Sequence, residues 1–215
     1  MQVKFCGFTQ LADIEAAIQL GVDAVGLVFY PPSPRAVTIA QAQQLTTGVP
    51  AFTSVVALVV NMDKDELMEL ADKVAFDIIQ FHGDESPEQC QQLANSVHKR
   101  WIKALRINSE QDTLASVQAK INDFASAGAS SILLDAYNPQ KYGGTGDQFD
   151  WDLIPTDSAL PIILAGGLDA DNVAATLDLP IYALDVSGGI ESAKGKKDED
   201  KMRGFMKAVK RDRWQ

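Results

Sequence analysis

The sequence has little cysteine and no long apolar run, and both shortages exclude classes of protein. Its 215 residues include 2 cysteines, Cys6 and Cys90, too few for a disulfide framework, and no CxxC spacing suggests zinc. The longest uninterrupted apolar run covers residues 55–60, far below the ~20 residues that a membrane-spanning helix needs. No apolar signal region follows Met1, so we expect a cytoplasmic protein with no membrane partner.

Basic residues are also scarce, with 19 Lys and Arg against 29 Asp and Glu, for a formal net charge of −10. Phosphate backbones are held by clustered Lys and Arg, so we expect no nucleic-acid partner. An acidic protein can still bind an anion in a local pocket of backbone amides and a few cations. With 46% hydrophobic and 22% charged residues, the composition is that of a globular protein.

Short β-rich runs alternate with segments of helical periodicity along the whole chain. The eight strand candidates are residues 2–6, 24–29, 55–60, 76–81, 101–105, 131–135, 161–165 and 182–186. Amphipathic helical spacing follows several of them, and Ser86-Pro87 with Gln89 has the pattern of a capped helix start. Repeated strand–helix units predict an α/β fold, a single (β/α)8 TIM barrel of eight parallel strands, with one domain over residues 1–215.

The alternative architecture is an open, doubly wound sheet. Such a sheet usually carries a glycine-rich dinucleotide-binding loop after its first strand. Here that place holds Cys6-Gly7-Phe8-Thr9, which lacks the fingerprint. The barrel is therefore the favoured fold.

Polar residues gather where the predicted strands end. Catalytic groups of a TIM barrel lie at the carboxyl ends of its strands and in the loops that follow. At or just after these ends stand Cys6, Arg35, Gln80, His82, Lys103, Arg106, Asp135 and Asp185. Stability alone does not require that concentration, so this rim is the predicted site.

Two glycine pairs follow the last two predicted strands. Gly166-Gly167 precede a helix expected near Asp169, and Ser187-Gly188-Gly189 follow the eighth strand. These loops form the usual phosphate site of such barrels, where backbone amides and a short helix N-terminus meet the dianion. The alternative is that the glycines only make tight turns, but two pairs at the two matching strands favour phosphate.

Cys6 and Asp135 are the candidate proton-transfer pair. A free thiol has a pKa of ~8.5 and needs a cationic neighbour or helix terminus to ionise near neutrality. A carboxyl group in a closing pocket can serve as a general acid. Alternatively, Cys6 is a small buried hydrophobe, as Cys90 is expected to be, and Asp135 and Asp185 cap helices or pair with Lys141 or Arg35.

The remaining rim residues have simpler interpretations. Arg35 follows a proline-rich run that holds its backbone stiffly, which suits a carboxylate ligand or a salt bridge equally. His82 is expected to form hydrogen bonds rather than bind metal. The segment 142–146, which contains Gly144, is either a loop over the site or a plain connection. The mixed-charge run 194–201 is expected to be a solvated loop and helix start.

Taken in order, these motifs resemble phosphoribosylanthranilate isomerase, a barrel enzyme of tryptophan biosynthesis. The first-strand segment Lys4-Phe5-Cys6-Gly7-Phe8-Thr9 is similar to the family motif K-I-C-G-L-T. The further similar segments are residues 26–35, 80–85, 134–136, 143–146, 164–168 and 185–191. Any one could arise by chance, but the ordered set covers nearly the whole chain.

The resemblance implies an Amadori rearrangement of N-(5-phosphoribosyl)anthranilate to its 1-deoxyribulose isomer, without cofactor or metal. It implies Cys6 as general base and Asp135 as general acid, with Arg35, Gln80, His82 and Asp185 binding substrate. The phosphate-binding residues would be Gly144, Gly166, Gly167, Ser187 and Gly188.

Two other functions compete with this one. A histidine-pathway phosphosugar isomerase resembles a two-aspartate machine whose first strand ends in Asp, and Cys6 argues against it. A non-catalytic phosphate-ligand-binding barrel would keep the glycines but lose Cys6 or Asp135, and both are present. We expect a monomer, because the helices leave no long apolar face uncovered.

Overall fold

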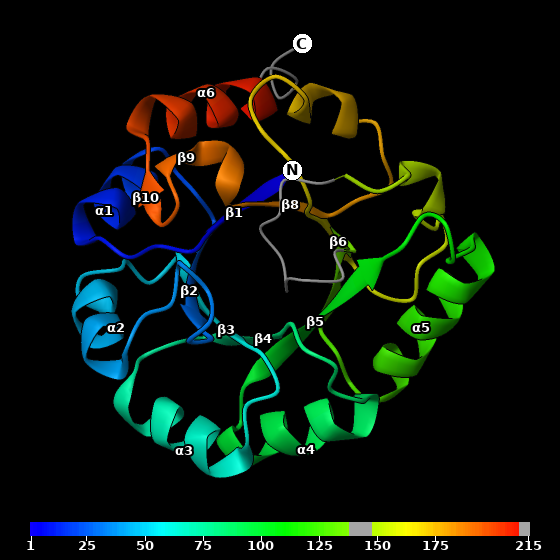
Figure 1. Cartoon of the computed structure of the whole chain (residues 1–215), viewed down its shortest axis with the longest axis horizontal. Coiled ribbons are helices and arrows are strands. Elements are labelled where there is room, and N and C mark those ends of the chain that lie inside the picture. Colours follow the sequence, from blue (N-terminus) through cyan, green and yellow to red (C-terminus); the bar gives the residue numbers. More distant parts are fainter. Residues whose placement is uncertain (138–147, 211–215) are drawn as a thin grey trace.

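The computed structural model describes residues 1–137 and 148–210, which form a closed barrel of parallel strands (Figure 1). The barrel closes because β1 pairs in parallel with both β2 and β8. The strands are β1 Gln2–Cys6, β2 Ala24–Phe29, β3 Ser54–Val59, β4 Ile78–Phe81, β5 Arg100–Ile107, β6 Ser131–Ala136, β7 Ile162–Leu164 and β8 Ala183–Val186. The predicted fold is confirmed, and each strand begins and ends within about two residues of the expected position.

The outer layer is helical over most of the circumference. Its α-helices are α1 Leu11–Gln19, α2 Ile39–Thr46, α3 Lys64–Lys73, α4 Pro87–Val97, α5 Leu114–Ser126 and α6 Glu199–Lys210. In two of the predicted strand–helix units, the described residues contain no α-helix, so the prediction is wrong there. After β6 there is only the 3-10 helix η1 (Trp151–Leu153), and after β7 only η2 (Val173–Thr176).

The segment after β7 has a helical start but no regular α-helix. The Asp169 Oδ1 atom accepts the backbone N–H groups of Asp171 and Asn172, as an N-cap does, and the Asp169 carbonyl accepts the N–H of Val173. The segment continues only as the 3-10 helix η2, so the helix predicted to begin near Asp169 is shortened.

Capping side chains fix where the other helices begin. Ser86 accepts the backbone N–H of Gln89, and the Gln89 side chain accepts the N–H of Ser86, which confirms the predicted start of α4. Thr38, Asp63 and Thr113 form the same capping boxes before α2, α3 and α5. Each box orients a helix so that its apolar face covers the sheet.

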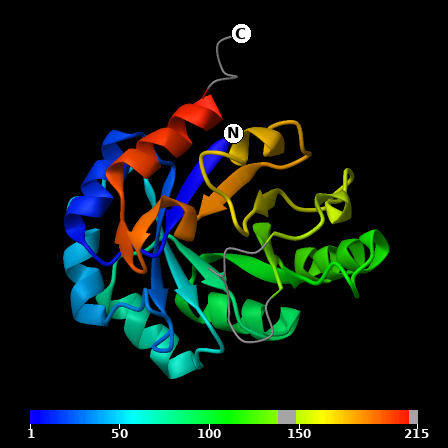
Figure 2. The same ribbon diagram turned by 45° about the horizontal axis from the view of Figure 1, so that its top comes forward.

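Side chains of both sheet faces are buried. The largest apolar cluster lies between strands and helices and includes Phe5, Leu27 and Phe205. Inside the barrel, one cluster joins β5 to β8 through residues such as Leu133, and another surrounds Cys6 with Val28, Leu58 and Val60. The last helix α6 packs beside the first helix α1 (Figure 2).

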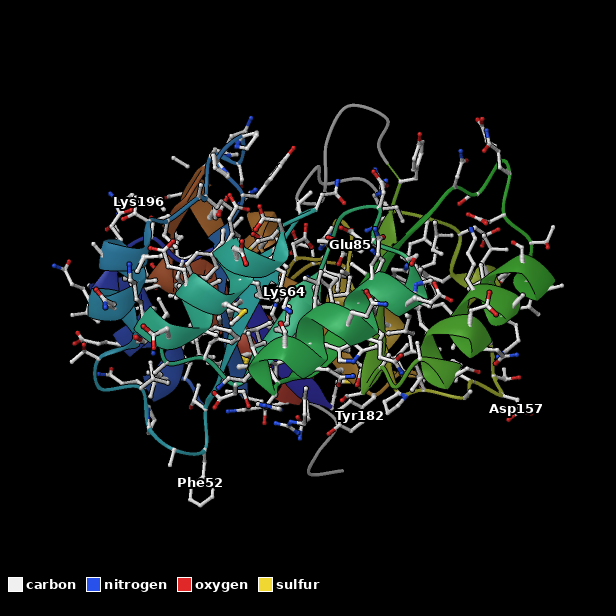
Figure 3. All side chains as sticks on the ribbon, turned by 90° about the horizontal axis from the view of Figure 1, so that it is seen from below. Phe52, Lys64, Glu85, Asp157, Tyr182 and Lys196 are labelled. Carbon is white, nitrogen blue, oxygen red and sulfur yellow. The ribbon has the colours of Figure 1, made fainter. Side chains whose placement is uncertain are left out.

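The two ends of the barrel differ in character. Figure 3 shows Phe52 and Tyr182 at one end, and Glu85 and Lys196 toward the other. A short hairpin of β9 (Glu191–Ala193) and β10 (Lys196–Lys197) follows β8 at the second end, after the 3-10 helix η3 (Gly188–Ile190). That end carries the carboxyl termini of the strands. Among the described residues, no helix has the length and hydropathy needed to cross a membrane.

Candidate active site

A cavity of about 880 Å³ opens at the carboxyl ends of the strands. It collects side chains and loops that are far apart in the sequence. Of the predicted site residues, the cavity is lined by Cys6, Arg35, Gln80, His82, Asp135, Gly166, Gly167, Asp185, Ser187 and Gly188. Gly144, the other predicted site residue, lies outside the described residues. Lys103 and Arg106, which were also predicted at this rim, do not line the cavity: Lys103 pairs with Glu85, and Arg106 pairs with Asp84.

Cys6 ends β1 with its side chain inside the barrel and only 5% of its residue surface exposed. Burial raises the pKa of the thiol, because the thiolate loses its water, and the nearby Lys4 ammonium offsets part of that rise. The expected cationic neighbours are therefore present, yet the effect of burial on the pKa of Cys6 is larger than theirs.

Asp135 stands across the cavity at the end of β6 and is also buried. Its Oδ1 atom accepts the N–H of Ala136, and its Oδ2 atom lies 3.3 Å from Nε2 of His82. That contact lacks hydrogen-bond alignment, and His82 Nε2 has no hydrogen-bond partner among residues 1–137 and 148–210. Buried polar groups are nearly always hydrogen-bonded. The edge formed by Asp135 and His82 is therefore suited to a polar ligand.

Gln80 supports His82 from the same strand end. Its Nε2 atom lies 3.0 Å from Nδ1 of His82, so the two side chains hold one another in place. Gln80 Oε1 is a second buried polar atom with no partner in the described part of the chain. Neither residue belongs to a group of three or more metal-binding side chains within the described ranges.

Arg35 reaches the cavity from the loop after β2 and is held by Glu191. Its Nε and Nη2 atoms donate to the two Glu191 carboxylate oxygens, both at 2.8 Å. Gly7, at φ +83°, makes room for this side chain, since a Cβ there would stand 2.4 Å from the Arg35 Cδ. The salt-bridge interpretation of Arg35 is thus realised, and the guanidinium still lines the cavity.

Lys197 does not line the cavity but holds two residues that do, and the sequence analysis missed this role. The run 194–201 was expected to be solvated, but Lys197 is buried and its Nζ donates to the Cys6 carbonyl at 2.6 Å and to Glu191 Oε1 at 2.9 Å. The correction has a physical reason: the β9–β10 hairpin folds back over β1, which no local pattern indicates. The sequence analysis included Glu191 only within the segment 185–191 and predicted no role for it.

The glycine loops meet at one wall of the cavity. Gly166 and Gly167 have φ of +89° and +60°, backbone values that favour glycine. A Cβ on Gly189 would stand 1.9 Å from the Leu168 carbonyl oxygen, so the loops after β7 and β8 touch there. Backbone amides can line such a wall, and Asp169, which caps the turn that leads into η2, lies on it.

Asp185 does not pair with Arg35, as one alternative held. It lies on β8 beside β1, and its Oδ1 atom accepts the Lys4 ammonium at 3.0 Å. Both side chains are buried. The Cys6 thiol and the Asp185 carboxylate therefore line the cavity, and the Lys4 ammonium pairs with that carboxylate.

An eight-stranded α/β barrel with its polar cavity at the carboxyl ends of the strands has the design of a TIM-barrel enzyme. The comparisons with known proteins place it more narrowly. The family model described as N-(5'phosphoribosyl)anthranilate (PRA) isomerase matches residues 3–208. The chain belongs to this family, and it is an isomerase of tryptophan biosynthesis.

Relatives and solved structures agree with that assignment. N-(5'-phosphoribosyl)anthranilate isomerase of Acinetobacter calcoaceticus is 47% identical over 209 residues, covering 97% of this chain and 96% of the relative. The Pseudomonas putida F1 enzyme of the same name is 48% identical over 208 residues, covering 96% of each. The structure of phosphoribosyl anthranilate isomerase from Thermotoga maritima has a TM-score of 0.85 and 33% identity, covering 98% of each chain.

A further isomerase structure is similar to this chain with a TM-score of 0.82 and 32% identity, covering 98% of each chain. It is a complex with reduced 1-(o-carboxyphenylamino)-1-deoxyribulose 5-phosphate. Membership in this family overturns both alternatives, the histidine-pathway isomerase and the non-catalytic binding barrel.

Proposed function

We propose that the chain converts N-(5'-phosphoribosyl)anthranilate to 1-(2-carboxyphenylamino)-1-deoxyribulose 5-phosphate, with Cys6 as general base and Asp135 as general acid. The observation that carries the assignment is that both residues line one cavity from different strands, β1 and β6. The Asp135 carboxyl group protonates the furanose ring oxygen. The C1'–O bond then breaks while the nitrogen lone pair forms the C1'=N bond of a cationic Schiff base.

Cys6, as thiolate, next takes the proton from C2'. The C–H electron pair becomes the C1'=C2' bond, and the pair of the C=N bond returns to nitrogen. The resulting enolamine tautomerises to the ketone. Substrate and product have the same formula, so the reaction needs no external oxidant or reductant. Burial raises the pKa of Cys6. The positive charge of the Schiff base lowers that pKa and so favours the thiolate.

The remaining residues would bind and orient the substrate. Arg35, fixed by Glu191, faces the anthranilate carboxylate, and Asp185 holds a sugar hydroxyl. Gln80 Oε1 and His82 Nε2 supply the open polar positions next to Asp135. The amides of Gly166, Gly167, Ser187 and Gly188 hold the phosphate, and Gly144 completes that set.

The test is the decay of anthranilate fluorescence, with the substrate generated in place by a phosphoribosyltransferase. Cys6→Ser and Asp135→Asn should each lower turnover by about 10²–10⁴-fold, the usual contribution of a general acid or base. Both variants should still bind the phosphorylated product. Cys90→Ala and Asp157→Asn are matched controls outside the cavity and should keep full turnover. Normal turnover by either site variant would remove that residue from the mechanism.

We also propose that one barrel domain spans residues 1–215 and works as a monomer in the cytoplasm. In the described residues, the large exposed hydrophobic side chains are scattered over separate elements, namely Leu11, Phe52, Met68, Leu114, Tyr137 and Tyr182. Both cysteines are free and buried, which suits a reducing compartment. Sedimentation equilibrium at several concentrations measures the oligomeric state directly.

A further inference from the structure

Lys4 is a charged residue inside the barrel that the proposed chemistry does not use. It lies two residues before Cys6 on β1, so both side chains project to the same face of the strand, toward the barrel interior. Only 5% of the Lys4 surface is exposed. Its ammonium donates to Asp185 Oδ1 at 3.0 Å, and the register of the sheet places the two residues opposite each other.

Stability alone does not explain this pair. Removing two charges from water is costly, and replacing a buried ion pair by packed apolar side chains is often neutral or stabilising. Other interior positions of this barrel carry apolar residues such as Leu133 and Ile163. The Lys4–Asp185 pair therefore occupies a place that two apolar side chains could fill.

The geometry connects Lys4 to the Cys6 sulfur. A Cβ added at Gly26 on the neighbouring strand would stand 2.7 Å from the Cys6 Sγ and 3.1 Å from the Lys4 Nζ. The thiol and the ammonium thus share the space over one glycine, which is open only because Gly26 has no side chain. They are near enough for a direct charge interaction.

Three other charged groups face Cys6. Asp185 from β8 is the acidic one, and its charge is paired with Lys4. Lys197 from β10 contacts the Cys6 carbonyl and is paired with Glu191. Arg35 is paired with Glu191 as well. Of the cations, Lys4 acts most strongly on the thiolate.

We propose that Lys4 is a positioning residue for the isomerisation: its ammonium, anchored by Asp185, stabilises the thiolate form of Cys6 and so makes a buried thiol usable as a base. The proposal rests on the assignment of Cys6 as the general base. It predicts that the charge of Lys4, rather than its volume, matters for Cys6.

Lys4 carries its positive charge at neutral pH. Burial lowers the pKa of the ammonium, but the Asp185 carboxylate and the Cys6 sulfur together raise it by more, so that the pKa is above its ordinary value.

The test measures the rate at which iodoacetamide alkylates Cys6 as a function of pH, read from the Cys6 peptide by mass spectrometry. An opposite charge at this range lowers a pKa by about one to three pH units. Lys4→Met should therefore raise the pH midpoint of alkylation and slow the reaction about tenfold or more at pH 8, while Lys4→Arg should remain near the wild type. Cys90, buried in α4, is the internal control for unfolding.

Lys4→Met leaves the Asp185 carboxylate buried without its partner and can lose stability for that reason. The double variant Lys4→Met/Asp185→Asn removes both charges and should also show slower Cys6 alkylation. An unchanged midpoint in the folded variants, with Cys6→Ser inactive, would overturn the role of Lys4 and leave the proposed function intact. Full turnover by Cys6→Ser would instead overturn the base assignment on which the role depends.

Discussion

The positions of the Cys6 sulfur and the Lys4 ammonium depend directly on Gly26. The Cys6 sulfur and the Lys4 ammonium both approach it more closely than a side chain would allow. Its glycine identity has nothing to do with backbone freedom, since it lies within the regular strand β2. Because Gly26 has no side chain, the Cys6 sulfur can occupy the space above it.

Gly26→Ala should lower kcat/KM about 10²-fold, because the new methyl group displaces the Cys6 sulfur, and a displacement of about 1 Å can cost that much. The fluorescence assay measures the loss. The matched control is Gly204→Ala in α6, where the added Cβ would meet only the Ala170 Cβ at 3.6 Å. That variant should keep its activity and gain up to about 1 kcal/mol of stability, because alanine favours helix. Equal activity of Gly26→Ala and wild type would contradict the steric argument.

Individual residues show which parts of the site can be predicted from the sequence and which cannot. Cys6, Asp135 and Asp185 were found because they end strands, and the end of a strand fixes where its last side chain lies. The roles of Glu191, which lines the cavity, and of Lys197, which holds Glu191 and the Cys6 carbonyl, were missed because both residues belong to a hairpin that folds back over β1. Their contacts join residues 156 and 191 positions apart in the chain. A single sequence carries no local signal for such pairs.

At the level of the elements, periodicity predicted the strands and most helices well. Alternation of apolar residues indicates which segments are buried, and capping residues such as Ser86 and Gln89 locate helix starts. After β6 and β7 the described residues form only the 3-10 helices η1 and η2 where regular helices were predicted. Periodicity indicates a buried face but does not decide between an α-helix and a short 3-10 turn.

The start of α4 can be tested by itself. Ser86→Ala removes the side-chain acceptor of the Gln89 amide and should lower the free energy of unfolding by about 1 kcal/mol, measured by urea denaturation. Ser96→Ala, in the same helix, removes only a bond to the Leu93 carbonyl and serves as the control. It should change stability by a few tenths of a kcal/mol. An equal loss of unfolding free energy in the two variants would show that the Ser86 cap stabilises the protein no more than the Ser96 bond does.

At the scale of the whole molecule, buried ion pairs link stability to pH. Burial raises the pKa of Glu191, but Arg35 and Lys197 lower it by more, so that its pKa in the folded protein is below the ordinary value of 4.5. A carboxyl group with a depressed pKa stabilises the fold above its unfolded pKa, and the contribution is lost as the pH falls through the folded pKa. The Arg35–Glu191–Lys197 cluster therefore favours the folded state at neutral pH.

The free energy of unfolding should accordingly fall as the pH drops below about 4.5. Urea denaturation at a series of pH values measures the fall. Glu191→Gln should be less stable at pH 7 by about 3 kcal/mol, because two buried cations lose their partner, and should show a shallower pH dependence. Glu199→Gln, at an exposed pair with Arg203, is the control and should behave as the wild type. A pH profile unchanged by Glu191→Gln would assign acid lability to other carboxyl groups.

The closure of the barrel by β1 and β8 also bears on how the protein is made. Cys6 is translated about 180 to 190 residues before Asp185, Ser187, Glu191 and Lys197. During synthesis, β1 keeps an unpaired edge until β8 has emerged from the ribosome. The cavity is therefore completed only after β8 and the loop that follows it have been made.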